Sequence, residues 1–340
     1  MNKKKIFISG GAGFIGCNVA NFHLNKGDFV TVYDNLSRLG TEKNLKWLKS
    51  HKNKHNFKFI KGDIRDFARL KKVLTDFDII YHLAAQVAVT TSVFDPRPDF
   101  EINAFGTFNM LEAFRLKSNK AIFIYASTNK VYGNLEDLDC VVKKGRYIFA
   151  NKKYANGVSE ERGIDFHSPY GCSKGAGDQY VRDYGRVFDL NTVVFRQSCI
   201  YGQRQFGNED QGWVIHFVRT VLNNKTLKIF GDGMQVRDIL HIDDLVNAYQ
   251  LAIKNNKLSR GQIYNIGGGI ENSISLLELI TILQSKISYK IRMKYYNWRE
   301  GDQKIYISDN SKLEKELNWK PVINKLKGID KLVNWAKSLD

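Results

Sequence analysis

Tyr170 and Lys174 lie four residues apart in the segment S-P-Y-G-C-S-K (168–174). On a helix, this spacing places both side chains on one face. An isolated tyrosine has a pKa of about 10, and lowering that pKa to about 7 requires roughly 4 kcal/mol of differential stabilisation. Two nearby cations at a partly desolvated site can supply this energy. The pair is therefore a candidate to take a proton from a hydroxyl while a hydride leaves. An ordinary amphipathic helix is the alternative interpretation.

A second polar cluster, S-T-N-K-V-Y-G (127–133), follows the apolar run A-I-F-I-Y-A (121–126). The run is typical of a buried strand. In an open parallel sheet, ligands bind at the carboxyl ends of the strands. Thr128, Asn129 and Lys130 therefore either form an ordinary turn or face a substrate.

Three glycines near the start of the chain predict a phosphate-binding turn. They are Gly10, Gly13 and Gly16 in the segment I-F-I-S-G-G-A-G-F-I-G-C, between a predicted strand and a predicted helix. In this setting Gly10 permits a tight turn, Gly13 lets the backbone approach a pyrophosphate, and Gly16 lets the helix pack on the strand. The helix N-terminus then presents free N–H groups to the anion. The pattern predicts a bound dinucleotide, and a glycine-rich turn without a ligand is the alternative.

Two aspartates at later strand ends extend this prediction. Asp34 ends the second predicted strand, where a carboxylate can hold the ribose hydroxyls of the adenosine. A carboxylate there opposes a 2′-phosphate, which favours NAD over NADP, although Arg38 lies close enough in sequence to weaken that preference. Asp63 and Ile64 follow the third strand and are expected at the adenine edge.

The elements that must position these residues alternate between strand and helix. Such alternation predicts an α/β Rossmann fold with a doubly wound parallel sheet. Strands are expected at 5–10, 29–34, 57–63, 78–84, 121–127 and 191–196, and helices from about Gly13 and at 66–75, 101–117 and 170–188. After about residue 200, strands at 228–233, 262–269 and 290–296 and helices near 212–223, 243–254 and 275–287 predict a smaller α/β lobe. We expect an NAD-binding domain over 1–190, completed by 191–197 and parts of 235–265, and a nucleotide-sugar-binding lobe over 198–340.

Composition excludes several classes of protein. The chain has 340 residues, 43% of them apolar, with no apolar segment of membrane-spanning length and no signal-peptide core. Its four cysteines are scattered, which favours reduced thiols in the cytoplasm. The net charge of +17 raises the possibility of nucleic-acid binding. Because the lysines are spread along the chain, a solvated basic surface is the preferred interpretation, with no nucleic-acid or membrane partner.

Together the motifs resemble the extended short-chain dehydrogenase/reductase family of NAD-dependent nucleotide-sugar epimerases and dehydratases. The resemblance also covers D-N-L-S-R, G-D-I-R, H-L-A-A-Q and R-D-I-L-H-I-D-D. It implies that Thr128 bonds the reacting hydroxyl, Tyr170 is the acid/base, and Lys174 binds the nicotinamide ribose and tunes Tyr170. The residues that it places at the cofactor are Gly10, Gly13, Phe14, Ile15, Gly16, Asp34, Asn35, Ser37, Arg38, Asp63, Ile64, Leu83, Ala84, Ala85, Asn103, Tyr170 and Lys174.

The residues after Thr128 distinguish between reactions within this family. The 4,6-dehydratases carry an Asp-Glu pair there, whereas this chain has Asn129 and Lys130, which disfavours dehydration. Several segments, among them Q-V-A-V-T-T-S (86–92), are most similar to the 2-epimerases of CDP-linked 3,6-dideoxyhexoses. This similarity implies oxidation at C2 by tightly held NAD, rotation of the keto sugar, and return of the hydride to its other face. Epimerisation at C4 of a UDP-hexose, or at C2 of another sugar, is the alternative.

The same resemblance suggests the substrate contacts. It places Arg204, Arg237 and Arg299 at the diphosphate, where a planar guanidinium can donate two bonds at once. The remaining candidates for contact with the sugar or nucleotide are Gln86, Thr128, Asn129, Lys130, His167 and Ser198. Many sugar epimerases of the family have Asn where this chain has Cys199, which puts one diphosphate contact in doubt.

No metal site is expected, because His82 and His241 have no cluster of further ligands at suitable spacing. The resemblance also implies a homo-oligomer, a dimer or tetramer, that pairs through the helices at 101–117 and 170–188. A basic nucleotide- or RNA-binding protein that merely kept the fold is the non-enzymatic alternative.

Overall fold

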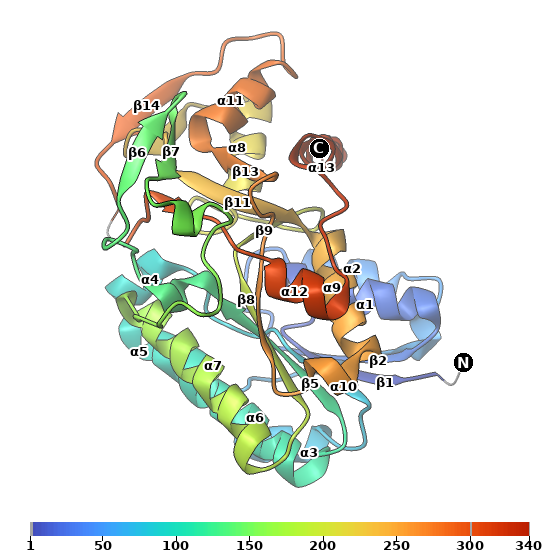
Figure 1. The fold of residues 1–340 in the computed structure, drawn as a ribbon. Helices are drawn as coiled ribbons and strands as arrows, with labels where there is room; N and C mark the ends of the chain where they lie inside the picture. Colours follow the sequence, from blue (N-terminus) through green and yellow to red (C-terminus); the bar gives the residue numbers. More distant parts are fainter. Residues whose placement is uncertain (1–2, 300, 340) are drawn as a thin grey trace.

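Seven short apolar segments pair side by side in one parallel sheet at the centre of the molecule. The computed structural model describes residues 3–299 and 301–339 (Figure 1). The sheet has the order β12-β8-β5-β4-β1-β2-β3, and every neighbouring pair is parallel. Its strands are β1 (Lys5–Ser9), β2 (Phe29–Asp34), β3 (Phe57–Lys61), β4 (Ile79–His82), β5 (Ile122–Thr128), β8 (Thr192–Gln197) and β12 (Ile263–Ile266). The chain order reverses beside β1, which creates the crevice where such sheets bind ligands.

Helices cover both faces of this sheet. One apolar cluster joins the sheet to α1 (Phe14–Lys26), α2 (Thr41–Lys49), α9 (Ile242–Lys254) and α12 (Ser311–Leu317). A second cluster joins its other face to α3 (Phe67–Val73), α6 (Gly106–Lys117) and α7 (Ser168–Val187). Burial of each large apolar side chain contributes about 1.5–3 kcal/mol, so these two layers hold the strand ends in place. The predicted doubly wound α/β fold is confirmed.

The segment before α6 departs from a regular helix. It consists of α4 (Val89–Phe94), α5 (Pro96–Phe100) and a π-helical turn, η2 (Glu101–Phe105), that continues directly into α6. Such π-turns are frequent at functional sites. The turn directs Asn103 towards Gln86, whose backbone N–H and C=O both bond to the Asn103 amide.

A smaller lobe lies against the carboxyl ends of the strands. It contains α8 (Trp213–Leu222), α11 (Leu276–Gln284) and α13 (Lys325–Lys337), packed around their own apolar cluster. Strand β10 (Leu227–Phe230) pairs with β14 (Met293–Tyr296), and β11 (Val236–His241) pairs with β9 (Cys199–Tyr201), β13 (Ser273–Ser275) and β15 (Ile305–Tyr306). The other elements are the hairpin β6 (Cys140–Lys143) and β7 (Arg146–Phe149), α10 (Asn256–Ser259), and the 3₁₀ turns η1 (Lys54–Asn56), η3 (Asn129–Tyr132) and η4 (Lys152–Tyr154).

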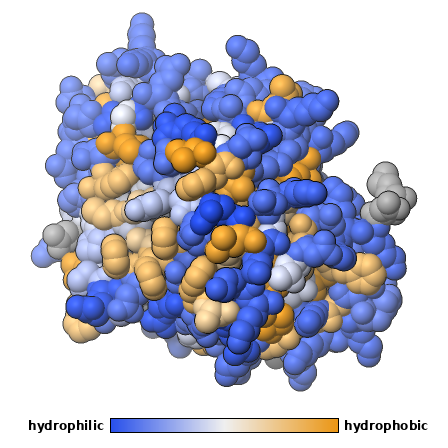
Figure 2. Space-filling model, turned by 90° about the horizontal axis from the view of Figure 1, so that it is seen from below, coloured by the Kyte–Doolittle hydropathy of each residue, from blue (hydrophilic) through white to orange (hydrophobic). Residues whose placement is uncertain are grey.

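The surface over α4 to α7 is unusually apolar. Figure 2 shows the molecule from below, on the side where these helices lie, with many apolar side chains near its centre. Large apolar side chains of these helices that stay exposed include Phe94 (92%), Phe100 (61%) and Val187 (63%). Several exposed apolar side chains on one face are a feature of interaction surfaces. Within the described ranges, no helix is long and apolar enough to cross a membrane.

Candidate active site

The glycine-rich turn connects β1 to α1 with little free space. Gly10 has φ of 68°, and a Cβ atom there would lie 2.6 Å from the backbone nitrogen of Ala84. A Cβ atom on Gly16 would collide with the carbonyl oxygen of Gly10, so the helix can approach the turn closely only with glycine at that position. Helix α1 begins after Gly13 without a side-chain cap. Its first N–H groups are therefore available to an anion.

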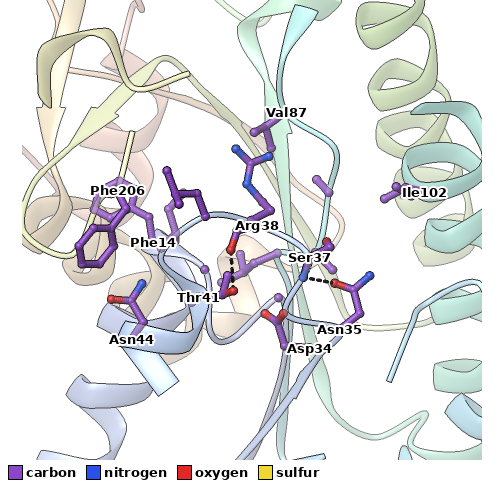
Figure 3. A pocket seen from close by; sticks show the side chains of 18 of the residues that line it. Phe14, Asp34, Asn35, Ser37, Arg38, Thr41, Asn44, Val87, Ile102 and Phe206 are labelled. Atoms are coloured by element: carbon purple, nitrogen blue, oxygen red, sulfur yellow. Dashed lines mark hydrogen bonds between the residues drawn. The ribbon is translucent and has the colours of Figure 1, made fainter. Parts of the chain in front are cut away.

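A cavity of about 370 Å³ opens above this turn (Figure 3). It is lined by fourteen of the predicted cofactor residues, namely Gly10, Gly13, Phe14, Ile15, Gly16, Asp34, Asn35, Ser37, Arg38, Asp63, Ile64, Leu83, Ala84 and Ala85. Lining residues that the sequence analysis missed are Tyr33, Leu39, Thr41, Asn44, Gly62, Val87, Ile102, Gln205, Phe206, Asn208 and Gln211. In Figure 3, Arg38 extends across the cavity towards Val87, and its guanidinium donates to the Gln211 side chain.

Two carboxylates sit at the strand ends beside this cavity. Asp34 accepts the backbone N–H groups of Ala12 (3.0 Å) and Leu36 (2.8 Å). Burial raises the pKa of Asp34, and these backbone donors oppose the rise. Asp63 accepts from Arg65 and from Asn35, and the Arg65 hydrogen bond lowers the pKa of Asp63 to about 2. A glycine cradle with no room for a Cβ, an uncapped helix start and two fixed carboxylates fit a dinucleotide.

Tyr170 lies on the first turn of α7, and its local backbone is strained. Ser168, two residues earlier, has φ of 66°, a left-handed conformation that costs a non-glycine residue about 1 kcal/mol or more. Its hydroxyl accepts the N–H of Gly171, and the N–H of Tyr170 bonds to the Ser92 hydroxyl. The Tyr170 side chain is 8% exposed. These contacts fix the backbone that carries the phenol.

The electrostatics of Tyr170 differ from the sequence-based expectation. Burial raises the pKa of Tyr170 to about 12, a rise that a hydrogen bond from Thr128 and the charge of Arg38 oppose, while the charge of Asp99 adds to it. Lys174 does not lower the pKa of the phenol, because its ammonium is bound elsewhere. The Lys174 Nζ atom donates to the carbonyl oxygen of Ala126 at 2.6 Å and lies over the Tyr125 ring. The side chains of this chain therefore leave Tyr170 as a neutral phenol at pH 7.

Lys174 is itself strongly perturbed. Burial lowers the pKa of its ammonium to about 7, and the carboxylates of Asp178 and Asp99 oppose that change. Its side chain lines neither cavity of the site. Lys174 therefore lies behind Thr128 and Tyr170, against the end of β5.

A second cavity, of about 380 Å³, adjoins the first and contains Thr128 and Tyr170. The two cavities share the lining residues Phe14, Ile15, Val87, Gln205 and Gln211. The predicted substrate residues that line the second cavity are Thr128, Asn129, Lys130, Ser198, Arg237 and Arg299. Thr128 and Tyr170 line only the second cavity, and the charge of Arg38, which lines the first, acts on Tyr170.

The two arginines of the second cavity are each paired with a carboxylate. Arg237 binds Asp302 at 2.5 Å, and Arg299 binds Glu209 at 2.9 Å. The Arg299 guanidinium also lies 3.9 Å from the centre of the Phe230 ring. Sequence reasoning missed Glu209, Asp302, Trp213, Phe217 and Phe230, because nothing local to them marks a binding site.

Lys130 and Ser198 are held by neighbours at the edge of this cavity. The Lys130 ammonium donates to the Gly301 carbonyl (3.0 Å) and the Gln303 side chain (3.3 Å). Burial lowers the pKa of Lys130 to about 8. The Ser198 hydroxyl donates to the buried Asp238 carboxylate. Cys199 also lines the cavity, and burial raises the pKa of its thiol, so it provides no negative charge there.

Four predicted contacts lie elsewhere. Arg204 lines the first cavity rather than the second, and its guanidinium stacks 4.2 Å from the centre of the Trp47 ring. Gln86 and Asn103 line neither cavity, since they bond to each other and brace the loop after β4. His167 occupies the N-cap position of α7 and also lies outside both linings.

The two histidines considered as metal ligands have structural partners. His82 lies between the hydroxyls of Ser9 (2.8 Å) and Thr107 (2.9 Å), and burial lowers its pKa to about 3. His241 caps α9 by accepting the N–H of Asp243. Among residues 3–299 and 301–339, no group of three side chains is arranged to hold a metal ion.

Comparison with known proteins places this geometry in a family. The profile of the GDP-mannose 4,6 dehydratase family matches residues 7–332. The chain is 45% identical to the CDP-paratose 2-epimerase of Salmonella typhi, with 98% of this chain and all of the relative covered. It is 32% identical to the UDP-glucose 4-epimerase of Mycolicibacterium smegmatis, with 98% and 99% covered.

A solved structure matches the whole fold. The UDP-glucuronic acid 4-epimerase of Bacillus cereus, determined with UDP-glucuronic acid and NAD, superposes with a TM-score of 0.83 at 30% identity, covering 99% of this chain and all of that one. The chain therefore belongs to the NAD-dependent epimerase/dehydratase family of extended short-chain dehydrogenases/reductases, enzymes that act on nucleotide sugars.

Proposed function

We propose that this protein is a CDP-paratose 2-epimerase, which converts CDP-paratose to CDP-tyvelose with NAD held throughout the cycle. The observation that carries the proposal is that Thr128 and Tyr170 line a cavity that directly adjoins the one above the glycine-rich turn. The first has the features of a dinucleotide site, and the second offers two arginines to a diphosphate. The 45% identity to the Salmonella typhi enzyme supports the choice of sugar.

In this proposal the side chains of the protein position the sugar and transfer one proton between its hydroxyl and Tyr170. NAD, when bound, supplies a reversible hydride acceptor and a positive ring that favours the phenolate of Tyr170. The Thr128 hydroxyl bonds to the sugar hydroxyl at C2, and Tyr170 takes its proton and later returns it. Lys174 lies behind these groups and holds the end of β5 through the carbonyl oxygen of Ala126. Once the keto sugar has turned, the hydride would return to its other face and the proton to its oxygen, so C2 would be inverted with no net consumption of cofactor.

The substrate side must hold the nucleotide firmly while the sugar turns. Arg237 and Arg299 offer charge-assisted hydrogen bonds to the diphosphate. Asp302 and Glu209, their present partners, must yield at least part of each guanidinium for this to happen. The keto sugar rotates in the part of the second cavity next to Thr128.

The residues after Thr128 oppose dehydration. Asn129 has no titratable group, and Lys130 carries an ammonium already bound to Gly301 and Gln303. The chain therefore lacks the adjacent pair of carboxyl groups that the dehydratases use there as acid and base. This supports redox-neutral epimerisation over loss of water.

We further propose that two copies pair through the apolar surface of α4 to α7 shown in Figure 2. The exposed residues Phe94, Phe100, Phe108 and Val187 would be covered by the same surface of the second copy. In Figure 2 hydrophilic residues surround these apolar side chains, as the polar rim of a protein–protein interface does.

One experiment tests the function directly. The purified protein is incubated with CDP-paratose, UDP-glucose or UDP-glucuronate, and the products are followed by NMR, while mass spectrometry identifies the released cofactor. Formation of CDP-tyvelose with retained NAD supports the proposal. If only a UDP-sugar is turned over, the proposed substrate is wrong but the proposed epimerisation chemistry is retained. Salt-sensitive nucleic-acid binding without NAD would overturn the enzymatic proposal.

A further inference from the structure

A buried carboxylate, Asp178, lies on the same face of α7 as Tyr170 and Lys174, one helical turn beyond Lys174. It forms a two-point ion pair with Arg196 of β8, with Nε–Oδ2 and Nη2–Oδ1 distances of 2.9 Å. The Asp178 side chain is fully buried, and that of Arg196 is 4% exposed. Asp178 accepts two further hydrogen bonds, from the Ser127 hydroxyl (2.7 Å) and the Gln179 amide (2.8 Å).

The Ser127 contact connects this carboxylate to the reacting groups. Ser127 lies between Ala126, whose carbonyl oxygen accepts a hydrogen bond from the Lys174 ammonium, and Thr128, which lines the second cavity together with Tyr170. A shift of Ser127 must therefore move both of its neighbours. Arg196 extends the network by donating to the Tyr132 hydroxyl at 2.9 Å, and Tyr132 donates to Asn265 at 2.8 Å. The network fixes the end of β5 to α7, β8 and β12.

We propose that Asp178 is a positioning residue for the proton transfer, acting through Ser127 to hold Thr128 and the Lys174-binding carbonyl of Ala126 in register with Tyr170. The proposal rests on the proposed function for the roles of Thr128, Tyr170 and Lys174. Asp178 lines neither cavity and reaches no substrate.

The charge of Asp178 has a second consequence at Lys174. The groups that face Lys174 are Asp178 from its own helix, Asp99 from α5, His82 from β4 and the Tyr125 ring from β5. The negative charges of these two carboxylates counteract the effect of burial on the pKa of Lys174. When one of them is removed, that pKa falls further. The alkaline limb of the pH–rate profile then moves to lower pH.

The test uses the NAD-loaded enzyme and its variants Asp178→Asn, Asp178→Glu and Ser127→Ala. Asp178→Asn is expected to lower kcat about 10- to 100-fold, because displacement of reacting groups by about 1 Å has effects of that size. KM and bound NAD are expected to change less than about twofold, and Asp178→Glu to recover part of kcat. The matched control is Asp28→Asn, which removes the buried partner of His23 at the opposite end of the sheet and leaves kcat unchanged.

Each outcome decides the proposal. A folded Asp178→Asn enzyme with wild-type kcat and an unmoved alkaline limb overturns it. Asp178→Asn leaves Arg196 unpaired and can fail to fold for that reason. In that case Ser127→Ala is the deciding variant, because it keeps the ion pair between Asp178 and Arg196. A wild-type kcat of Ser127→Ala overturns the proposal. A crystal structure of Ser127→Ala gives a readout independent of substrate. Loss of the 2.6 Å contact between Lys174 and Ala126 supports the proposal even if the wild-type enzyme acts on another sugar.

Discussion

The Nζ atom of Lys174 lies 2.6 Å from the carbonyl oxygen of Ala126, so a buried ammonium ties α7 to the strand that ends at Thr128. A Tyr and a Lys spaced four apart share a helix face, but this contact directs the lysine to the backbone rather than to the phenol. The lysine thus stabilises the geometry of the site, while its own charged form is disfavoured by burial.

This burial makes a prediction about stability and pH. The pKa of Lys174 falls from 10.5 to about 7 on folding, so between these values the unfolded chain binds more protons and stability rises with pH. Below pH 7 the full penalty of burying the charge is present. Lys174→Met is therefore expected to raise Tm most at pH 6 and least above pH 10, in thermal melts of both proteins across that range. A gain in Tm that does not vary with pH would contradict this account.

Removal of the phenol tests the acid/base assignment. Tyr170→Phe is expected to lower kcat by a factor of about 10² to 10⁴, the usual contribution of a positioned acid/base. NAD content and Tm are expected to be nearly unchanged, because the phenol contributes little to packing beyond its ring. Tyr184→Phe is the matched control, since Tyr184 lies on the same helix and its hydroxyl bonds to Glu112. An epimerase that stays fully active without the Tyr170 hydroxyl uses another group.

The arginines of the second cavity make a separate prediction for binding. Arg237→Met and Arg299→Met are each expected to raise KM for the nucleotide sugar about tenfold or more, since a hydrogen bond to a charged group contributes about 1.5–3 kcal/mol. The change in kcat is expected to be smaller, because these residues hold the nucleotide rather than the reacting carbon. Arg186→Met removes an exposed arginine paired with Asp183 and serves as the control. Steady-state kinetics on the proposed substrate measure the changes in KM and kcat separately.

Much of the fold and of the first cavity could be predicted because the determining features are local. The close approach of Gly10 to Ala84 requires a residue without a side chain, and that requirement is visible in the sequence. The polar residues at the end of β5 likewise follow from strand polarity. Helix α2 was not predicted, because T-E-K-N-L-K-W-L-K contains few apolar residues and buries them only against α1 and the sheet.

The parts that could not be predicted depend on the path of the chain in space. Arg204 was expected at the substrate, but the backbone turns at this residue with φ of 69° and its side chain stacks on Trp47 of α2 instead. Asn103 lies behind the cofactor loop because a π-helical turn, which no periodicity indicates, rotates it towards Gln86. The carboxylates that pair with Arg237 and Arg299 come from distant segments, so their charges were missed.

The cofactor site makes a prediction about retention of NAD. Asp34→Asn keeps the size of the side chain but replaces one acceptor by an amide, next to the two backbone N–H groups that Asp34 now binds. The variant is expected to lose most of its NAD during purification, because the ribose loses a carboxylate partner and the turn at Ala12 loosens. Mass spectrometry of the released small molecules measures the loss. Asp76→Asn, at an exposed position paired with Lys5, is the control.

The apolar surface of α4 to α7 makes a prediction about assembly. If a second copy covers Val187, which is 63% exposed, a charge placed there is buried without a partner and the pairing weakens. Val187→Glu is expected to shift the protein from dimer to monomer in light scattering at micromolar concentration. Val322→Glu is the control, since Val322 is 78% exposed in the loop between α12 and α13. Helix α7 carries both Val187 and Tyr170. A monomer with reduced kcat would therefore show that pairing also stabilises the position of the catalytic helix. A fully active monomer would show that the surface serves assembly only.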